Sequence, residues 1–154
     1  MNDIKYDKDI FSFAYRVSAL IYNKDKTKIL LFYGENSNFY MLPGGKVHEL
    51  EKSEDAIKRE INEELGFKNL QFELSGISEE LVKQDGKNIH QITFTYKSIY
   101  ENEIIKEKFK SIESDWINFE WVDIKKLGNL KIHPSNINKM INNKFTHLIE
   151  EINK

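Results

Sequence analysis

Cysteine is absent from the 154 residues, which excludes disulfide bonds, thiolate metal sites and a cysteine nucleophile. Long apolar runs are also missing, because no stretch approaches the roughly 20 residues of a membrane-spanning helix. The polar residues 1–8 lack the apolar run of a signal peptide. We therefore expect a cytoplasmic protein with no membrane partner.

An excess of one charge is missing as well. The 23 basic and 25 acidic side chains leave a net charge of −2, which provides no basic field for nucleic acid, so we expect no nucleic-acid partner. Apolar residues make up 40% of the chain, a normal value for a globular protein, and the length fits one domain over residues 1–154. The composition leaves a homodimer open.

Segments rich in β-forming residues alternate with turn signals along most of the chain. The expected strands are 11–21, 28–33, 39–42, 67–82, 89–99 and 116–122. Two pairs of them are predicted to form hairpins, one around the turn at 23–26 and one around Asp85-Gly86. The charged segment 101–115 is expected to be a mobile loop, and 124–127 to form one helical turn.

Two segments have helical periodicity. Ser53 can cap a helix over 54–65, and Gly66 marks its end because glycine readily takes the left-handed conformation. Near the C-terminus, apolar side chains recur close to every 3.6 residues, which predicts an amphipathic helix over 136–152. Its apolar positions are Ile137, Met140, Ile141, Phe145, Leu148 and Ile149. Together these elements indicate an α/β fold with helices packed on a mixed sheet.

An acidic face is predicted on the first helix. At 100° per residue, Glu60, Glu63 and Glu64 fall within an arc of about 100°. Each pair of carboxylates at roughly 5 Å repels by on the order of 3 kcal/mol at an effective dielectric of about 20. A hard dication would reverse this repulsion, and an oxygen-only ligand set suits Mg²⁺ or Mn²⁺, which in turn favour a phosphate-containing substrate. The alternative is an ordinary solvated helix face.

The residues around this face resemble the Nudix box. Gly45, five residues, Glu51 and seven further residues precede Arg59-Glu60-Ile61-Asn62-Glu63-Glu64-Leu65-Gly66-Phe67, in which only Phe67 stands where an aliphatic residue is more usual. Such spacing should arise by chance only about once in a million chains of this length. The lead-in 40–45 and the segments 119–122 and 123–127, with Pro134, also resemble members of the Nudix hydrolase family.

This resemblance implies an α/β/α sandwich with a loop–helix–loop catalytic motif. It also implies that Glu60, Glu63 and Glu64 bind the metal, helped by the Gly45 carbonyl. Arg59 is expected to orient the carboxylates, and one helix carboxylate, with Glu63 as a catalytic candidate, or Glu51 is expected to activate water. The implied reaction is Mg²⁺- or Mn²⁺-dependent hydrolysis of a phosphoanhydride bond in a nucleoside diphosphate linked to another group.

Two loop positions depart from the family pattern. His48 stands where many members have Glu, and Leu50 stands where many have Gly. Leu50 is expected to alter the path of the loop towards Glu51. His48 is a candidate for contacting substrate phosphate, with simple solvation as the alternative. Gly44 and Gly45 follow a proline, and we expect a backbone conformation that only glycine takes easily.

Further candidates lie outside the box. Arg16, a charged residue among apolar neighbours, is predicted to bind phosphate in a cleft, unless it points outward from its strand. Phe39 and Tyr40 are candidates for stacking on a base, with a place in the core as the alternative. Glu79 and Glu80 are candidates for auxiliary metal ligands.

Two other functions are weighed against hydrolysis. A non-catalytic Nudix module would sense a nucleotide, but it would be expected to have lost box carboxylates, and all are present. A Nudix-fold isomerase would use a cysteine that this chain lacks. The expected partner is therefore a nucleotide-type substrate. Pro134 is the only proline after the box, which disfavours the ADP-ribose-cleaving relatives but leaves several other nucleotide classes open.

Overall fold

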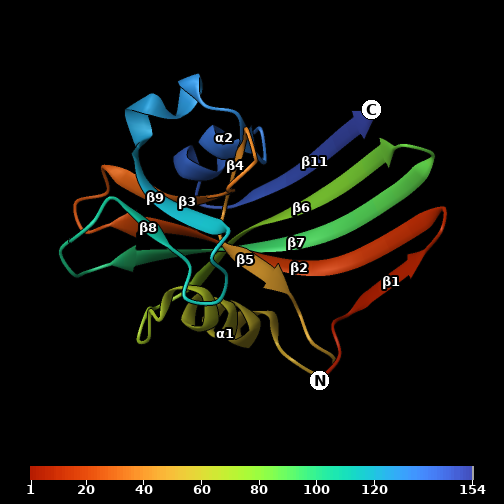
Figure 1. Ribbon diagram of the computed structural model, residues 1–154, viewed down its shortest axis with the longest axis horizontal. Coiled ribbons are helices and arrows are strands. Elements are labelled where there is room, and N and C mark those ends of the chain that lie inside the picture. Colours follow the sequence, from red (N-terminus) through yellow and green to blue (C-terminus); the bar gives the residue numbers. More distant parts are fainter. Residues whose placement is uncertain (154) are drawn as a thin grey trace.

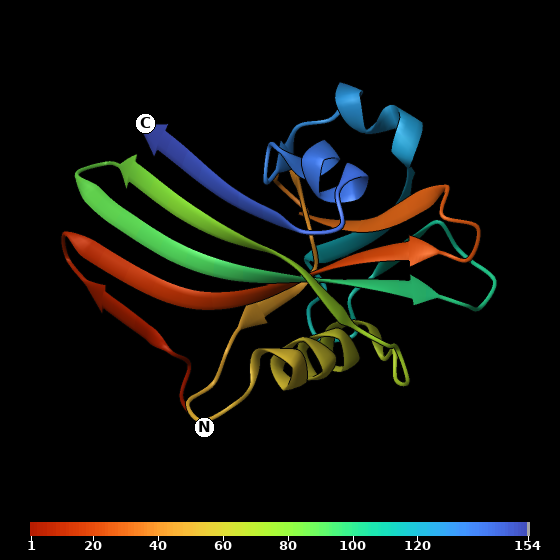
Figure 2. The ribbon, with the colours of Figure 1, turned by 180° about the vertical axis from the view of Figure 1, so that it is seen from behind.

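The computed structural model describes residues 1–153 and consists of one curved sheet with helices on both faces (Figures 1 and 2). In chain order the elements are β1 (Lys5–Lys8), β2 (Phe11–Asn23), β3 (Lys28–Gly34), β4 (Tyr40–Met41), β5 (Gly44–Lys46), α1 (Ser53–Leu65), β6 (Glu73–Gln84), β7 (Lys87–Tyr100), β8 (Lys108–Lys110), β9 (Ile117–Asp123), the 3₁₀ helix η1 (Ile124–Asn129), β10 (Ile132–His133), α2 (Ile137–Asn142) and β11 (Thr146–Asn153). None of the helices in this part of the chain is long and apolar enough to cross a membrane.

The sheet is mixed, as expected. Its central order is β10-β4-β3-β2-β7-β6-β11, while β1 and β5 also pair with β2, and β9 links β3 to β8. The pairs β2–β7, β6–β11 and β4–β10 are parallel, and the remaining pairs are antiparallel. The long strands β2, β7, β6 and β11 extend together beyond the part of the molecule that carries the helices (Figures 1 and 2).

Two apolar clusters hold the layers together. On one face, α1 packs its buried residues Ala56, Ile57 and Ile61 against the sheet. On the other face, α2 and η1 cover a second cluster that includes Leu20 and Met140. Figure 1 shows the helices on opposite sides of the sheet, which confirms the predicted α/β fold with helices on both faces.

Both predicted hairpins are present. Asn23 closes the first turn, because its side-chain oxygen accepts hydrogen bonds from the backbone N–H groups of Thr27 and Lys28 at 2.9 and 2.8 Å. In the second turn, Asp85 and Gly86 have φ values of 52° and 76°, the left-handed geometry that matches the twist of a two-residue hairpin.

The predicted C-terminal helix over 136–152 is wrong. Only Ile137–Asn142 is helical, and Thr146–Asn153 forms β11, which pairs in parallel with β6 over eight residues. The helical spacing of the apolar residues does not decide the structure here. As a strand, the segment forms backbone hydrogen bonds with the edge of β6 and buries Leu148 in the second cluster.

Three smaller expectations are also corrected. The segment 101–115 contains β8, and its Ser111 and Ile112 donate hydrogen bonds to the Glu64 carbonyl at 3.2 and 3.1 Å, so it is anchored on α1. The strand expected over 67–82 begins only at Glu73. Ser53 does not cap α1 but shares a 2.5 Å hydrogen bond with the Tyr96 hydroxyl.

Candidate active site

Helix α1 presents its acidic residues because its other face is anchored. Ala56, Ile57 and Ile61 are fully buried, which fixes the rotation of the helix, and the Glu60 carboxylate then lies against Gly45 of β5. Gly66 ends the helix with φ 70°, and its N–H donates to the Asn62 carbonyl at 2.9 Å. The predicted glycine stop is therefore present.

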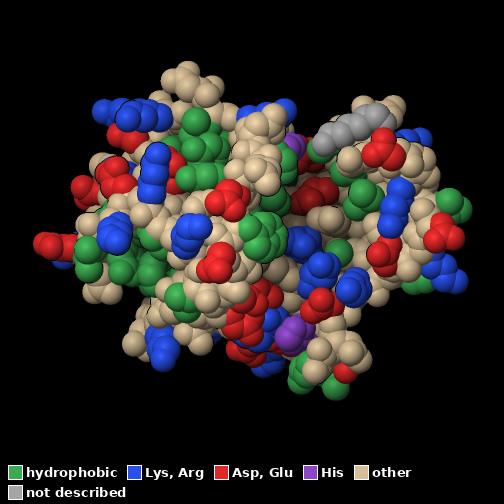
Figure 3. Space-filling view, viewed as in Figure 1, with side chains coloured by type: hydrophobic (Ala, Val, Ile, Leu, Met, Phe, Trp, Pro, Cys, Tyr) green, Lys and Arg blue, Asp and Glu red, His purple; other side chains and the backbone are tan. Residues whose placement is uncertain are grey.

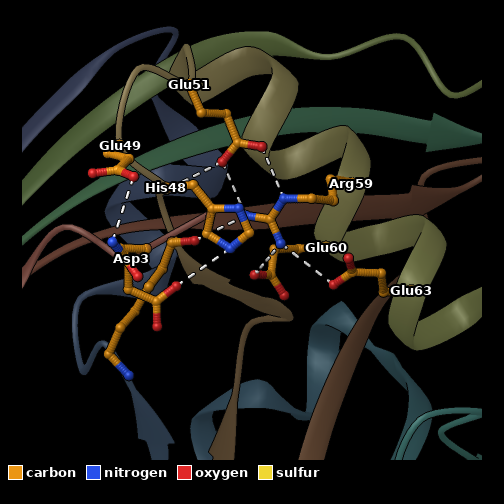
Figure 4. Close-up of polar contacts among 9 residues, drawn as sticks. Asp3, His48, Glu49, Glu51, Arg59, Glu60 and Glu63 are labelled. Atoms are coloured by element: carbon orange, nitrogen blue, oxygen red, sulfur yellow. Dashed lines mark hydrogen bonds and ion pairs between the residues drawn. The ribbon is translucent and has the colours of Figure 1, made fainter.

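Arg59 is the centre of the polar network in the loop–helix unit (Figure 4). Its Nε and Nη2 donate to the two carboxylate oxygens of Glu51 at 2.8 and 3.0 Å, a bidentate pair. Nη1 donates to Glu60 at 2.9 Å and to Glu63 at 3.3 Å, and Nη2 also donates to the Lys46 carbonyl at 3.0 Å. The guanidinium thus ties the loop to the helix and holds two of the three helix carboxylates.

Glu51 has two hydrogen-bonding partners, Arg59 and the His48 backbone. Besides the Arg59 pair, its Oε1 accepts the backbone N–H of His48 at 3.0 Å. The hydrogen bonds from Arg59 are the largest cause that lowers the pKa of Glu51 to about 2. The loop path requires the left-handed conformation at Leu50, whose φ is 60° and whose side chain is 99% exposed. The loop therefore brings Glu51 to Arg59 with a leucine in a conformation that favours glycine.

Glu60 and Glu64 are the partly buried carboxylates of the face, whereas Glu63 is exposed. Burial raises the pKa of Glu60 in spite of its ion pair with Arg59. Burial, reinforced by the negative charges of Glu60 and Glu113, raises the pKa of Glu64 to about 8, and the positive charge of Arg16 opposes this only in part. Two carboxyl groups thus lie in a poorly hydrated place where a cation would stabilise their charged forms.

The two glycines of β5 are required by close packing, not by an unusual φ. A Cβ on Gly44 would lie 2.0 Å from the Val17 carbonyl oxygen, and one on Gly45 would lie 2.3 Å from the Glu60 carboxyl carbon. Neither glycine has a positive φ. The expectation of a glycine-only backbone conformation is therefore wrong, and the need for glycine comes from the approach of β2 and of Glu60.

A cavity of about 380 Å³, here called the acidic cleft, opens above these groups. Its walls include Asp3, Arg16, Gly45, Glu60, Glu64 and Glu113. The guanidinium of Arg16 is close enough to Glu64 to lower its pKa, so the cleft contains a cation beside several acids. Such a site can accept a dication together with the phosphates of a substrate.

Comparison with known proteins agrees with this geometry. A family model described as NUDIX domain matches residues 12–143. The chain belongs to the NUDIX family. The m7GpppN-mRNA hydrolase of Saccharomyces cerevisiae is 29% identical over 160 residues, which cover 88% of this chain but only 14% of that relative.

Solved structures share the NUDIX fold. The mutator MutT protein of Bacillus halodurans has a TM-score of 0.67 and 22% identity, with 86% of this chain and 84% of that chain covered. The dihydroneopterin triphosphate pyrophosphohydrolase of Escherichia coli has a TM-score of 0.66 and 16% identity, with 86% and 95% covered. The prediction of a Nudix pyrophosphohydrolase is therefore confirmed at the level of the family.

The other predicted substrate residues of this NUDIX chain lie in different places. Phe39 lines a second cavity that Arg16 also borders, and its ring meets His133 edge-on at 5.0 Å. Tyr40 packs edge-on against Tyr33, and its hydroxyl donates to Glu120 at 3.3 Å, so it does not line either cavity beside Arg16. The His48 ring lies 3.3 Å from Asp3 (Figure 4), and His48 is not among the residues that line the acidic cleft.

Some residues of the cleft had no clear signal in the sequence. Asp3 comes from the N-terminal segment and Glu113 from the segment expected to be a mobile loop. Their spacing from the box carries no information, because the fold alone brings them near α1. The anchoring of 111–112 on the Glu64 carbonyl is what places Glu113 at the cleft.

The donor set fits the divalent metal that the NUDIX family implies. All candidate ligands are oxygens, and the partly buried Glu64 carboxylate accepts no hydrogen bond from any residue between 1 and 153. Because Gly45 has no Cβ, the Glu60 carboxylate can lie directly against its backbone. Within the same range, no three acidic or histidine side chains are grouped closely enough to hold a metal ion by themselves, and Arg59 pairs with Glu60 and Glu63. Glu60, Glu64 and the Gly45 carbonyl would hold the metal, with Glu63 beside them.

Proposed function

We propose that the chain hydrolyses a phosphoanhydride bond in a nucleoside diphosphate linked to another group, and that it needs Mg²⁺ or Mn²⁺. The observation that carries this proposal is the pair of partly buried carboxyl groups of Glu60 and Glu64, which share one cleft with Arg16. Partial loss of water around two neighbouring acids is costly unless a cation binds there, and a phosphate chain supplies the remaining oxygens that Mg²⁺ prefers.

Metal binding, phosphate binding and positioning are assigned to different residues of the site. A bound dication would neutralise phosphate charge and lower the pKa of the attacking water. Arg16, which lines the same cleft, binds the phosphate chain. Arg59 and Glu51 act as positioning residues, because Arg59 holds Glu60 and Glu63 in place.

Glu63 is the proposed proton acceptor. Its side chain is 44% exposed, and its only contact with Arg59 is the 3.3 Å hydrogen bond. Glu51 is less suited to this role, because a carboxylate with a pKa of about 2 is a weak base near neutral pH. The bidentate Arg59 pair would also have to break before Glu51 could reach water.

The names of the relatives support this chemistry. One is an m7GpppN-mRNA hydrolase and another a dihydroneopterin triphosphate pyrophosphohydrolase. Both names describe the cleavage of a compound that contains a chain of linked phosphates. The whole yeast relative is far longer than this chain, so only the class of bond, and not capped RNA, enters the proposal.

The test is a screen of nucleoside triphosphates, nucleotide sugars and dinucleoside polyphosphates with Mg²⁺, in which products are identified by chromatography. We expect a nucleoside monophosphate and a phosphorylated remainder, loss of activity in EDTA and its return with Mg²⁺ or Mn²⁺. Glu60→Gln is the matched inactive control. Tight nucleotide binding without turnover by the parent would instead support the non-catalytic module.

A further inference from the structure

A second cavity lies on the sheet and shares Arg16 with the acidic cleft. This strand pocket has a volume of about 360 Å³, and its walls include Arg16, Phe39, Glu80, Gln91, His133 and Glu150. Arg16 borders both cavities. Figure 3 shows a hollow between the body of the molecule and the extended strands, with acidic and basic side chains inside it. A ligand whose phosphates contact Arg16 can therefore place its other end in the strand pocket.

The polar side chains of this pocket form a row across three strands. Gln91 of β7 is opposite Glu80 of β6, and Glu80 is opposite Glu150 of β11. The next row, two residues along, holds Arg16 opposite Thr93. Because side chains two residues apart share a face, both rows point to the same side of the sheet, about 7 Å apart.

Both carboxylates keep free acceptor positions. Among residues 1–153, Glu80 accepts one hydrogen bond, from the Thr93 hydroxyl at 3.1 Å, while Oε1 of Glu150 accepts from the Ser135 hydroxyl at 3.0 Å and from the Ser135 backbone N–H at 3.5 Å. A carboxylate has about four acceptor sites, so each can take further N–H groups. Burial raises the pKa of Glu80, and the negative charge of Glu150 adds to this effect. Two neighbouring acids exclude phosphate from this end of the pocket and favour a neutral group rich in N–H donors.

We propose that Glu80 and Glu150 determine base specificity by selecting a purine of the guanine type. Only this base has two adjacent donors, N1–H and the 2-amino group, on the edge that would meet a carboxylate. Adenine offers an acceptor beside its amino group, and uracil places its N–H between two carbonyls. Phe39 and His133 supply the aromatic wall for the ring. This proposal rests on the proposed hydrolysis of a nucleotide.

The experiment compares kcat/KM for GTP, ITP, ATP and UTP. ITP lacks the 2-amino group alone and so isolates the second donor. We expect GTP to exceed ATP and UTP by about 10- to 100-fold, the usual worth of a hydrogen bond to a charged group, and ITP to lie between them. Binding of GMP, IMP, AMP and UMP, measured by calorimetry without metal, should follow the same order.

Two variants and a control locate the effect. Glu80→Gln replaces an acceptor by an amide donor, which can pair with adenine, so the ratio of GTP to ATP should fall by about tenfold or more; Glu150→Gln should lower it as well. Glu79→Gln is the matched control, because Glu79 lies on the opposite face of β6 and pairs with His147. Its specificity should equal that of the parent.

The outcomes separate the two proposals. Equal kcat/KM for all four triphosphates, or a Glu80→Gln variant with the parental ratio, overturns the base assignment while hydrolysis stands. A parent that binds GMP preferentially but hydrolyses no nucleotide supports the base assignment and overturns the proposed function. Absence of both binding and hydrolysis overturns both.

Discussion

Glu64, a proposed metal ligand, lies in surroundings that disfavour its charged form when no metal is bound. Its carboxyl group is partly buried near Glu60 and Glu113, which raises its pKa from the usual value of a glutamate, about 4.5, to about 8. Between these two pH values the unfolded chain has lost the proton that the folded chain keeps. The contribution of Glu64 to stability therefore falls as pH rises from about 4.5 to about 8.

Replacement of Glu64 by Gln removes this pH-dependent term. Without metal, the melting temperature of the variant relative to the parent should rise as pH goes from 5 to 8. Activity with Mg²⁺ should nevertheless fall by about 100-fold or more, because a ligand to the ion is lost. Thermal melts at several pH values, beside a hydrolysis assay, check both effects. A variant with parental activity would contradict the assignment of Glu64.

Leu50 provides a second test at the residue scale. It has φ 60° and an almost fully exposed side chain, so it has the strain of a left-handed residue without any packing gain. Leu50→Gly should stabilise the protein by about 0.5–1 kcal/mol, after the entropy cost of glycine in the unfolded chain is included. Leu50→Asn should have a smaller effect of the same sign. Urea unfolding measures both, and destabilisation by either change would argue against this loop geometry.

Single residues differ in how well the sequence predicted them. The grouping of Glu60, Glu63 and Glu64 follows from helical geometry, and Arg59 can reach two of them because it lies one and four residues away. The bidentate Glu51 pair and the strand pocket depend on tertiary structure. Glu80 meets Glu150 only through the register of β6 and β11, which no local pattern contains.

At the scale of an element, the packing of strand β5 predicts different effects for substitutions at its two glycines, Gly44 and Gly45. Gly45→Ala would place its methyl group against the Glu60 carboxylate, which must then shift away from Arg59, so Mg²⁺ affinity and activity should fall; because a side-chain end and not the backbone has to move, stability should fall less than for Gly44→Ala. Gly44→Ala would meet the Val17 backbone and should prevent stable folding. Gly128→Ala is the control, because no atom lies near its added Cβ. Melting curves with and without Mg²⁺, beside an activity assay, distinguish the three variants.

Helix α1 and the hairpins could be predicted because their signals are local. The apolar period, the glycine stop and the Asp85-Gly86 turn each act within a few residues. The segment 101–115 could not be predicted in the same way. Its order comes from pairing of β8 with β9 and from two hydrogen bonds to the end of α1, all of which join residues distant in the sequence.

At the scale of the whole molecule, the C-terminal strand explains the largest error. In β11 the residues that share a face are Thr146, Leu148, Glu150 and Ile152, and the carboxylate interrupts the apolar alternation that identifies a strand. Glu150 lies there because it lines the strand pocket. A polar residue on the inward face thus removes the alternation that would predict a strand, while the adjacent apolar residues Leu148 and Ile149 fit the spacing of an amphipathic helix.

This difference gives a test of the fold that needs no activity. In a helix over 136–152, Leu148 and Ile149 would both belong to the buried stripe, and both alanine substitutions would be costly. In the strand, Leu148 is 7% exposed within the second cluster, whereas Ile149 is 56% exposed on the opposite face. Leu148→Ala should therefore cost about 2–5 kcal/mol, and Ile149→Ala should stay within about 0.5 kcal/mol of the parent. Urea unfolding of both variants measures the two free energies. Similar large losses for the two substitutions would contradict the strand and restore the helix.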